Sequence, residues 1–177
     1  NINVTSNGKA IMTPAERADA RAAIDQALAF TDGLTPKERD WIRALDQRYD
    51  GQAATPRDPL DRAWADALAE MAARYPDDTT VASVYAEALM NTMPWDYWGP
   101  DGEAKPDTRA VIASLEAVMA ADPHHPLALH LYIHALEASS NAKKAEPAAD
   151  RLANLVPGSG HLVHMPSHIY FRVGRYQ

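Results

Sequence analysis

The amino-acid sequence predicts an all-α protein. Alanine is very frequent and β-branched residues are sparse, a composition that favours helix. Apolar residues recur every three or four positions in successive runs of about 11–18 residues, which is the period of an amphipathic helix. No run alternates apolar and polar residues as a half-buried strand does. Short breaks with Pro, Gly or Asp separate most of the runs, and we therefore expect about seven to eight helices.

Two segments carry the signature of a helix N-terminus. These are "TPAE" at Thr13–Glu16 and "TPKE" at Thr35–Glu38. In each, the Thr side chain can accept a hydrogen bond from a backbone N–H of the first turn, and Pro suits the first helical position. The Glu three positions on can reach back to the Thr backbone. Helices are therefore expected to begin after Thr13 and after Thr35.

The later helices are predicted by stripes of apolar residues at helical spacing. The stripes are Trp41, Leu45 and Tyr49; Leu60, Trp64, Leu68, Met71 and Tyr75; Val81, Val84, Tyr85 and Leu89; Val111, Ile112, Leu115, Val118 and Met119; and Leu129 to Leu136.

Composition excludes several classes of function. The net charge is −7 and no block of Lys and Arg stands out, which argues against a nucleic-acid or anionic-membrane partner. The chain has no cysteine, so disulfides and thiolate metal sites are excluded. No run of about 18 apolar residues is present to span a bilayer. The polar N-terminus is not a signal peptide, and we expect a soluble fragment of a longer protein, its compartment left open.

Three predicted helix ends share a proline and suggest an internal repeat. They are "RYPDD" at Pro76, "ADPHHP" at Pro123 and "LVPGSG" at Pro157. The step from Pro123 to Pro157, which we call the repeat shift, is shorter than the step from Pro76 to Pro123. The additional length of the earlier step fits one place, the aromatic segment "MPWDYWGPDGEAKPD" at 93–107. The sequence therefore predicts a helical repeat with one loop insertion.

The repeat shift has the length of the tetratricopeptide repeat (TPR), a helix–turn–helix unit of about 34 residues, and the chain resembles that family. "TRAVIASLEAVMAADPHHP" resembles the second helix of such a repeat with its Asp-Pro exit, and "GRY" at Gly174–Tyr176 resembles the turn between its two helices. "AEALMNTMPWDYW", "HLYIHALEAS" and "GHLVHMPSHIY" resemble a subgroup of bacterial TPR proteins that offers no catalytic residues to carry over. The resemblance covers roughly residues 36–177. It implies one α-solenoid of antiparallel helix pairs over residues 1–177, in which the first helix of each repeat lines a concave face.

The repeat relates the histidines to one another. The repeat shift places His130 on His164 and His134 on His168. The step from Pro76 to Pro123 places Glu87 on His134. Side chains four positions apart share one helix face, and equivalent positions of neighbouring repeats stack side by side. We therefore expect these four histidines and Glu87 to adjoin on the concave face.

Imidazole and carboxylate ligands together suit a divalent transition metal, namely Zn, Fe, Cu, Ni or Mn. The sequence thus predicts one or two metal ions held by His130, His134, His164, His168 and Glu87. An ion with an open coordination position could activate water or oxygen, and hydrolysis, redox chemistry and storage all stay open. Glu137 and His161 are possible additional ligands. The pocket around the metal is expected to be lined by Tyr85, Tyr132, Asn91, Trp95 and Trp98.

Pro166 lies between His164 and His168 and argues against a regular helix across this pair. Its ring disfavours helix at the preceding residue, so His164 could lie in an entry turn and no longer share a face with His168.

A metal-free scaffold is the alternative function. Its histidine-lined groove would bind a peptide, another protein or the remainder of the chain. The aromatic loop is either a lid over the histidines or a cap on the core.

Overall fold

The computed structural model describes residues 12–52 and 54–176, and it confirms the all-α prediction. Residues 1–11, which the sequence prediction included in the array, lie outside the described part. The helices are α2 (Pro14–Ala29), α3 (Pro36–Arg48), α4 (Arg57–Arg74), α5 (Thr79–Thr92), α6 (Pro106–Ala121), α7 (Pro126–Glu137), the 3-10 turn η1 (Ala142–Ala145), α8 (Glu146–Leu152), α9 (Gly160–His164) and α10 (Pro166–Val173).

Both predicted N-terminal signatures form capping boxes. At α2, Thr13 Oγ1 accepts a hydrogen bond from the backbone N–H of Glu16, and Glu16 accepts one from the backbone N–H of Thr13. Thr35 and Glu38 repeat this arrangement at α3. Each box satisfies two N–H groups that have no partner within the helix. The sequence signature therefore locates both helix starts correctly.

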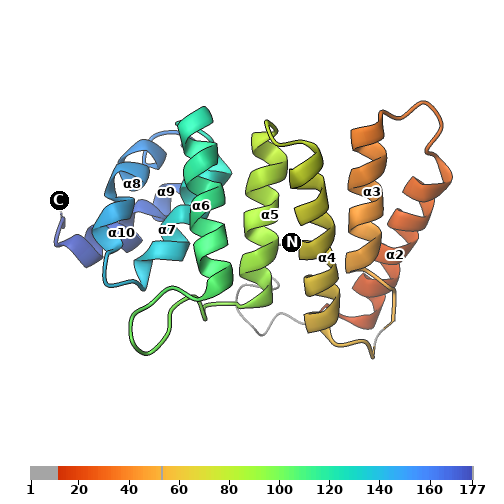
Figure 1. The fold of residues 1–177 in the computed structure, drawn as a ribbon, viewed down its shortest axis with the longest axis horizontal. Helices are drawn as coiled ribbons and strands as arrows, with labels where there is room; N and C mark the ends of the chain where they lie inside the picture. The colour runs from red at the N-terminus through yellow and green to blue at the C-terminus, as the bar shows by residue number, and fades with distance from the viewer. Residues whose placement is uncertain (1–11, 53, 177) are drawn as a thin grey trace.

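The helices from α2 to α6 stand side by side in chain order, and α7 to α10 gather at the other end of the array (Figure 1). Consecutive helices pack against each other from the pair α2 and α3 to the pair α7 and α8. Helices that are not consecutive also meet, since α7 touches both α5 and α10. The helices that carry Glu87, His134 and His168 are thus neighbours, as the repeat predicts.

A continuous apolar core runs between the helices. Its fully buried large side chains include Leu68, Leu115, Leu129, Leu152, Ile133, Met165 and Ile169. Ile133, with 0% of its surface exposed, lies on α7 between the two histidines of that helix. Burying a side chain of this size stabilises the fold by about 1.5–3 kcal/mol. Core packing therefore fixes the rotation of α7 and with it the positions of His130, which is buried, and His134, which is partly exposed.

The loop between α5 and α6 is anchored to α7. The indole Nε1 of Trp98 donates to the backbone carbonyl of Ala135 at 2.8 Å, and Thr108 Oγ1 donates to the carbonyl of Tyr97 at 2.6 Å. Trp95 has φ 61°, a left-handed conformation that is uncommon and strained for a bulky residue. The anchored loop therefore holds Trp95 in a conformation that an unrestrained chain would rarely adopt.

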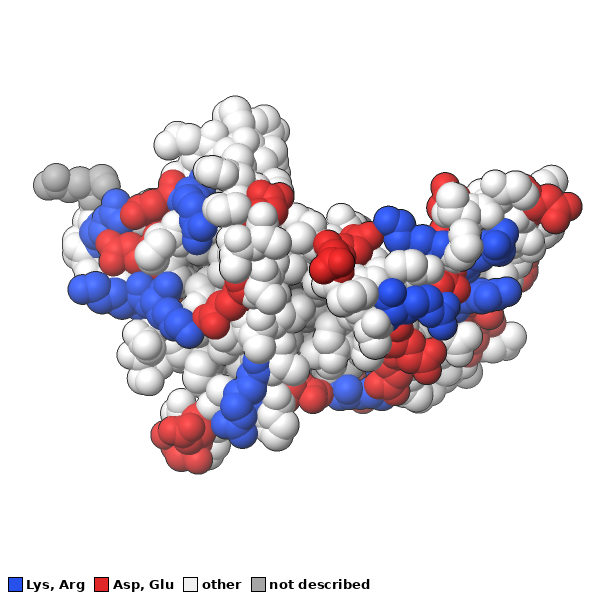
Figure 2. Space-filling view, turned by 45° about the horizontal axis from the view of Figure 1, so that its top comes forward, with Lys and Arg blue, Asp and Glu red and all other residues white. Residues whose placement is uncertain are grey.

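Charged side chains of both signs alternate on the face shown in Figure 2. Many are paired, as in Arg62–Asp107 at 2.8 Å and Lys144–Glu116 at 2.6 Å. Such exposed pairs each contribute about 0–1 kcal/mol. In the described part of the chain, no helix has the length and apolar character needed to cross a membrane.

Candidate metal centre

Five histidines and one glutamate gather where α7, α9 and α10 meet. We call this set the histidine cluster: His130, His134, Glu137, His161, His164 and His168. The first three lie on α7, His161 and His164 on α9, and His168 on α10. Two overlapping groups in the cluster bring three ligand atoms within 4.8 Å of one another, a spacing that one metal ion can span.

The first group is His130, His134 and His161. Nε2 of His130 lies 3.0 Å from Nε2 of His161, and the two rings meet edge to face with centroids 5.0 Å apart. The centroids of His130 and His134 are 4.8 Å apart, because the two residues lie one turn apart on α7. His130 is buried, whereas His161 is exposed, so the group spans from the core to the surface.

The second group is His134, Glu137 and His168. The Glu137 carboxylate contacts one ring nitrogen of each histidine: Oε1 lies 2.8 Å from Nδ1 of His134, and Oε2 makes a short contact with Nδ1 of His168. A carboxylate can only accept hydrogen bonds, so both Nδ1 atoms donate, and in a neutral ring the lone pair is then on Nε2. Glu137 thereby sets the tautomer and the orientation of both rings. Metal-binding histidines commonly have such a carboxylate partner.

Burial and neighbouring groups favour the metal-binding forms of His130, His161 and Glu137. Burial, reinforced by the nearby His134 and His161, lowers the pKa of His130 to about 3. Burial and neighbouring histidines also lower the pKa of His161. Burial opposes ionisation of Glu137, but hydrogen bonds from His134 and His168 outweigh it and hold the pKa of Glu137 below its ordinary value. Neutral imidazole and ionised carboxylate are the ligand forms that metals require.

One aromatic ring of the α5–α6 loop covers part of the cluster. The ring of Trp95 meets that of His134 edge to face, with centroids 5.3 Å apart. Trp95 is 49% exposed, so its other side faces solvent. The contact with His134, together with the strained backbone of Trp95, favours the lid interpretation of this loop over a core cap. Trp98 instead reaches the backbone of α7 through its indole nitrogen.

Glu87 lies in neither three-residue group of the described part of the chain. It is buried on α5, and burial raises its pKa to about 7, while the positive charge of Arg48 at the end of α3 acts in the opposite direction. Its Oε1 atom has no hydrogen-bond partner among the described residues. The repeat thus places Glu87 on the expected helix, but its carboxylate belongs to neither group of ligand atoms, and the charge that acts on its pKa is that of Arg48.

The other pocket residues predicted from the sequence lie on several surfaces. The Tyr132 hydroxyl donates to Glu116 on α6 at 2.7 Å, and Tyr85 is partly buried on α5. Asn91 is buried near the end of α5. Of the five predicted pocket residues, Trp95 is the one for which the described contacts include a ring of the histidine cluster.

His161 and Glu137 are closer to the centre of the cluster than the repeat alone suggested. The repeat shift pairs His161 with Leu127, so the repeat gives no signal for it. The short helix α9 turns His161 toward His130. Glu137 could have been found more directly, because it lies three positions after His134 on a helix and such residues are surface neighbours.

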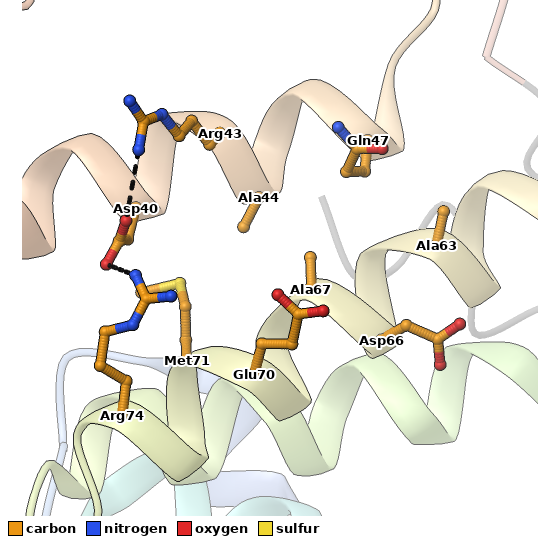
Figure 3. Close-up of a pocket in the computed structure, with 10 residues that line it drawn as sticks. All are labelled: Asp40, Arg43, Ala44, Gln47, Ala63, Asp66, Ala67, Glu70, Met71 and Arg74. Carbon is orange, nitrogen blue, oxygen red and sulfur yellow. Dashed lines mark hydrogen bonds and ion pairs between the residues drawn. The ribbon is translucent and has the colours of Figure 1, made fainter.

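A separate pocket of about 580 Å³ lies between α3 and α4 and contains none of the histidines (Figure 3). The Asp40 carboxylate at its edge accepts hydrogen bonds from Arg74 at 2.5 Å and from the Tyr75 hydroxyl at 2.8 Å. Burial alone would raise the pKa of Asp40, but these two partners hold that pKa below its ordinary value. Asp66 and Glu70 also line the pocket, which is therefore polar and mixed in charge.

Comparisons with protein-family models, curated proteins and solved structures give no match for this chain. The function is therefore argued from the chemistry of the histidine cluster itself.

Proposed function

We propose that this protein binds a divalent transition metal through its histidine cluster. The observation that carries the proposal is the group His130, His134 and His161, whose ligand atoms lie within 4.8 Å of one another. Imidazole is the ligand type that Zn, Cu, Fe and Ni share, and the chain has no cysteine to offer a thiolate.

The spacing of the nitrogen atoms fits a shared ion. Metal–imidazole bonds are about 2.0–2.1 Å long, so two such ligands at 90–110° lie roughly 2.8–3.4 Å apart. The Nε2 atoms of His130 and His161 are 3.0 Å apart, which is within that range. A hydrogen bond between the two imidazoles would give the same distance. Titration with a metal ion distinguishes such a hydrogen bond from a shared metal site. His134 supplies the third nitrogen, and Glu137 fixes its ring.

Three protein ligands leave a coordination position for water or substrate. This is the ligand count of catalytic rather than structural zinc sites. An ion held by the first group would therefore supply activation of a bound water. The partly exposed ring of Trp95 stands at His134 and would limit access to that position.

The helical array that holds this centre is proposed to be a TPR-like solenoid. Contacts of α7 with both α5 and α10 support the proposal, because alternate helices of a solenoid stack on one face. The repeat shift relates the histidine positions of α7 to those of α9 and α10. In this arrangement the metal would link consecutive repeats.

Titration calorimetry of the full chain with Zn²⁺ or Ni²⁺ tests the metal proposal. We expect at least one equivalent to bind, and His134→Ala or His161→Ala to weaken binding by at least about tenfold. His124→Ala is the matched control, because His124 is exposed and belongs to neither three-residue group. Wild-type protein that takes up neither ion would refute the proposal.

A peptide-binding scaffold is the second candidate. The pocket between α3 and α4 favours it, since a groove of about 580 Å³ with acidic Asp66 and Glu70 suits a basic peptide side chain. We expect Asp66→Asn/Glu70→Gln to abolish capture of a lysine-rich peptide from a display library. Equal capture by this variant and by wild type would count against the scaffold.

A further inference from the structure

A pair of histidines in the cluster lies outside the first metal group. Nε2 of His164 and Nε2 of His168 are 3.0 Å apart, and the ring centroids are 4.8 Å apart. This nitrogen spacing equals that between His130 and His161. His164 is exposed and His168 is partly buried, so the pair is open to solvent.

The pair forms although Pro166 stands between its members. Met165 keeps helical backbone angles, φ −54° and ψ −40°, and joins the end of α9 to the start of α10. Its N–H donates to the carbonyl of His161, and its own carbonyl accepts from the N–H of His168, both at 3.1 Å. The Met165 side chain is fully buried and anchors this joint. The chain therefore stays helical through the proline, and two histidines four positions apart share a face.

Both Nε2 atoms face each other because the Nδ1 atoms are engaged elsewhere. Nδ1 of His168 contacts Oε2 of Glu137, and a carboxylate oxygen requires that Nδ1 donate. Nδ1 of His164 lies 3.4 Å from the hydroxyl oxygen of Ser167. The lone pair of His168 Nε2 is thus directed at His164, where a cation between the two rings would be stabilised.

We infer that His164 and His168 form a second metal position, linked to the first through Glu137. This inference rests on the proposed function, because both positions use the same carboxylate. One oxygen of Glu137 contacts His134 of the first position and the other contacts His168 of the second. The carboxylate therefore orients one ligand of each ion, and its charge supports both.

The two positions are unequal. The first offers three imidazoles and the second offers two, so the second ion takes more of its ligands from water or from a small oxygen-donor molecule. Imidazole ligands select ions such as Zn²⁺, Ni²⁺, Cu²⁺ and Co²⁺ over Mg²⁺ and Ca²⁺, which prefer oxygen. The second position accordingly binds a borderline divalent ion more weakly and exchanges it more readily than the first.

Calorimetric titration with Zn²⁺, followed by metal analysis after dialysis, tests this arrangement. Wild-type protein should bind two equivalents, the second at least about tenfold more weakly than the first. His164→Ala should remove the weaker equivalent alone, whereas His161→Ala should weaken the tighter one. Glu137→Gln should weaken both, by about 10–100-fold, because it removes the carboxylate that orients His134 and His168. His124→Ala serves as the control, and circular dichroism checks that each variant is folded.

The outcomes separate this inference from the proposed function. A single equivalent that survives His164→Ala would overturn the second position and leave the proposed function standing. Loss of all binding in folded His164→Ala would show one shared centre and would also overturn it. No binding by wild type would refute the second position and the proposed function together. A Glu137→Gln variant that binds both equivalents with wild-type affinity would refute the link through Glu137.

Discussion

Glu87→Gln should stabilise the protein at pH 8. Glu87 is 8% exposed, and burial raises the pKa of its carboxyl to about 7, against opposition from the Arg48 charge. Its Oε1 atom has no hydrogen-bond partner in residues 12–52 and 54–176. Above pH 7 the folded protein therefore holds a buried, incompletely compensated carboxylate, and a neutral amide of similar shape removes that cost.

The size of the effect follows from the difference in pKa. The unfolded side chain ionises near its ordinary pKa of about 4.3, and each unit of difference corresponds to ~1.4 kcal/mol. Ionised Glu87 therefore lowers the free energy of unfolding by about 4 kcal/mol. Because the folded pKa is raised, this loss is absent below the unfolded pKa, grows as pH rises from about 4 to about 7 and is constant above that range.

Urea unfolding of wild type and Glu87→Gln between pH 4 and pH 8 measures this difference. The variant should gain about 4 kcal/mol at pH 8 and less than about 1 kcal/mol near pH 4.5. Glu70→Gln, at an exposed position of α4, is the matched control and should show little change at either pH. A Glu87→Gln variant that is less stable than wild type at pH 8 would refute the claim that the buried Glu87 carboxylate destabilises the fold. We also expect the Glu87→Gln variant to keep its affinity for metal, since Glu87 lies in neither three-residue group. Loss of metal binding in this variant would show instead that Glu87 is a metal ligand.

Two further predictions concern the loop and the core. Binding of Cu²⁺ or Ni²⁺ should quench the fluorescence of Trp95, whose ring lies 5.3 Å from that of His134 between centroids, and Trp95→Phe should remove most of the quenching. Trp41→Phe on α3 is the control, and quenching that persists in Trp95→Phe would place the ion elsewhere. Leu68→Ala should lower the free energy of unfolding by about 2–5 kcal/mol, because Leu68 is fully buried in the core. Leu45→Ala, at a position that is 36% exposed, should cost less than about 1 kcal/mol, and equal effects of the two variants would contradict the described core.

Local sequence signals predicted the helices well. The Thr-Pro-x-Glu segments determine their own hydrogen bonds, so the capping boxes at Thr13 and Thr35 could be recognised without knowledge of tertiary structure. Apolar spacing likewise located the stripe of α4, from which Trp64 and Leu68 enter the core.

The repeat predicted which helices would meet, but not which side chains would. The structure has His134 of α7 beside His168 of α10, two positions that the repeat shift relates, whereas His130 contacts His161. The repeat could not reveal the burial of Glu87 or the effect of the Arg48 charge on its pKa, because Arg48 lies in another helix and does not follow the period. An equivalent position in a repeat specifies a place on a helix face, whereas the contact depends on the neighbouring helices.

The contribution of α9 was also beyond the repeat. The proline at 166 suggested an interruption that would separate His164 from His168. Instead, the hydrogen bonds of Met165 carry the helical path across the joint, and the short helix adds His161 to the cluster. These features depend on the burial of Met165, a tertiary property that spacing alone does not encode.

Elemental analysis of the full chain, purified without a histidine tag or chelator, tests the central claim most directly. We expect at least one equivalent of a transition metal per chain after incubation with Zn, Fe, Cu, Ni or Mn salts and removal of free ion. His134→Ala should lose it, because His134 belongs to both three-residue groups, and His124→Ala should retain it. Wild-type protein that holds none of these metals, or a His134→Ala variant that binds them as wild type does, would contradict the metal centre.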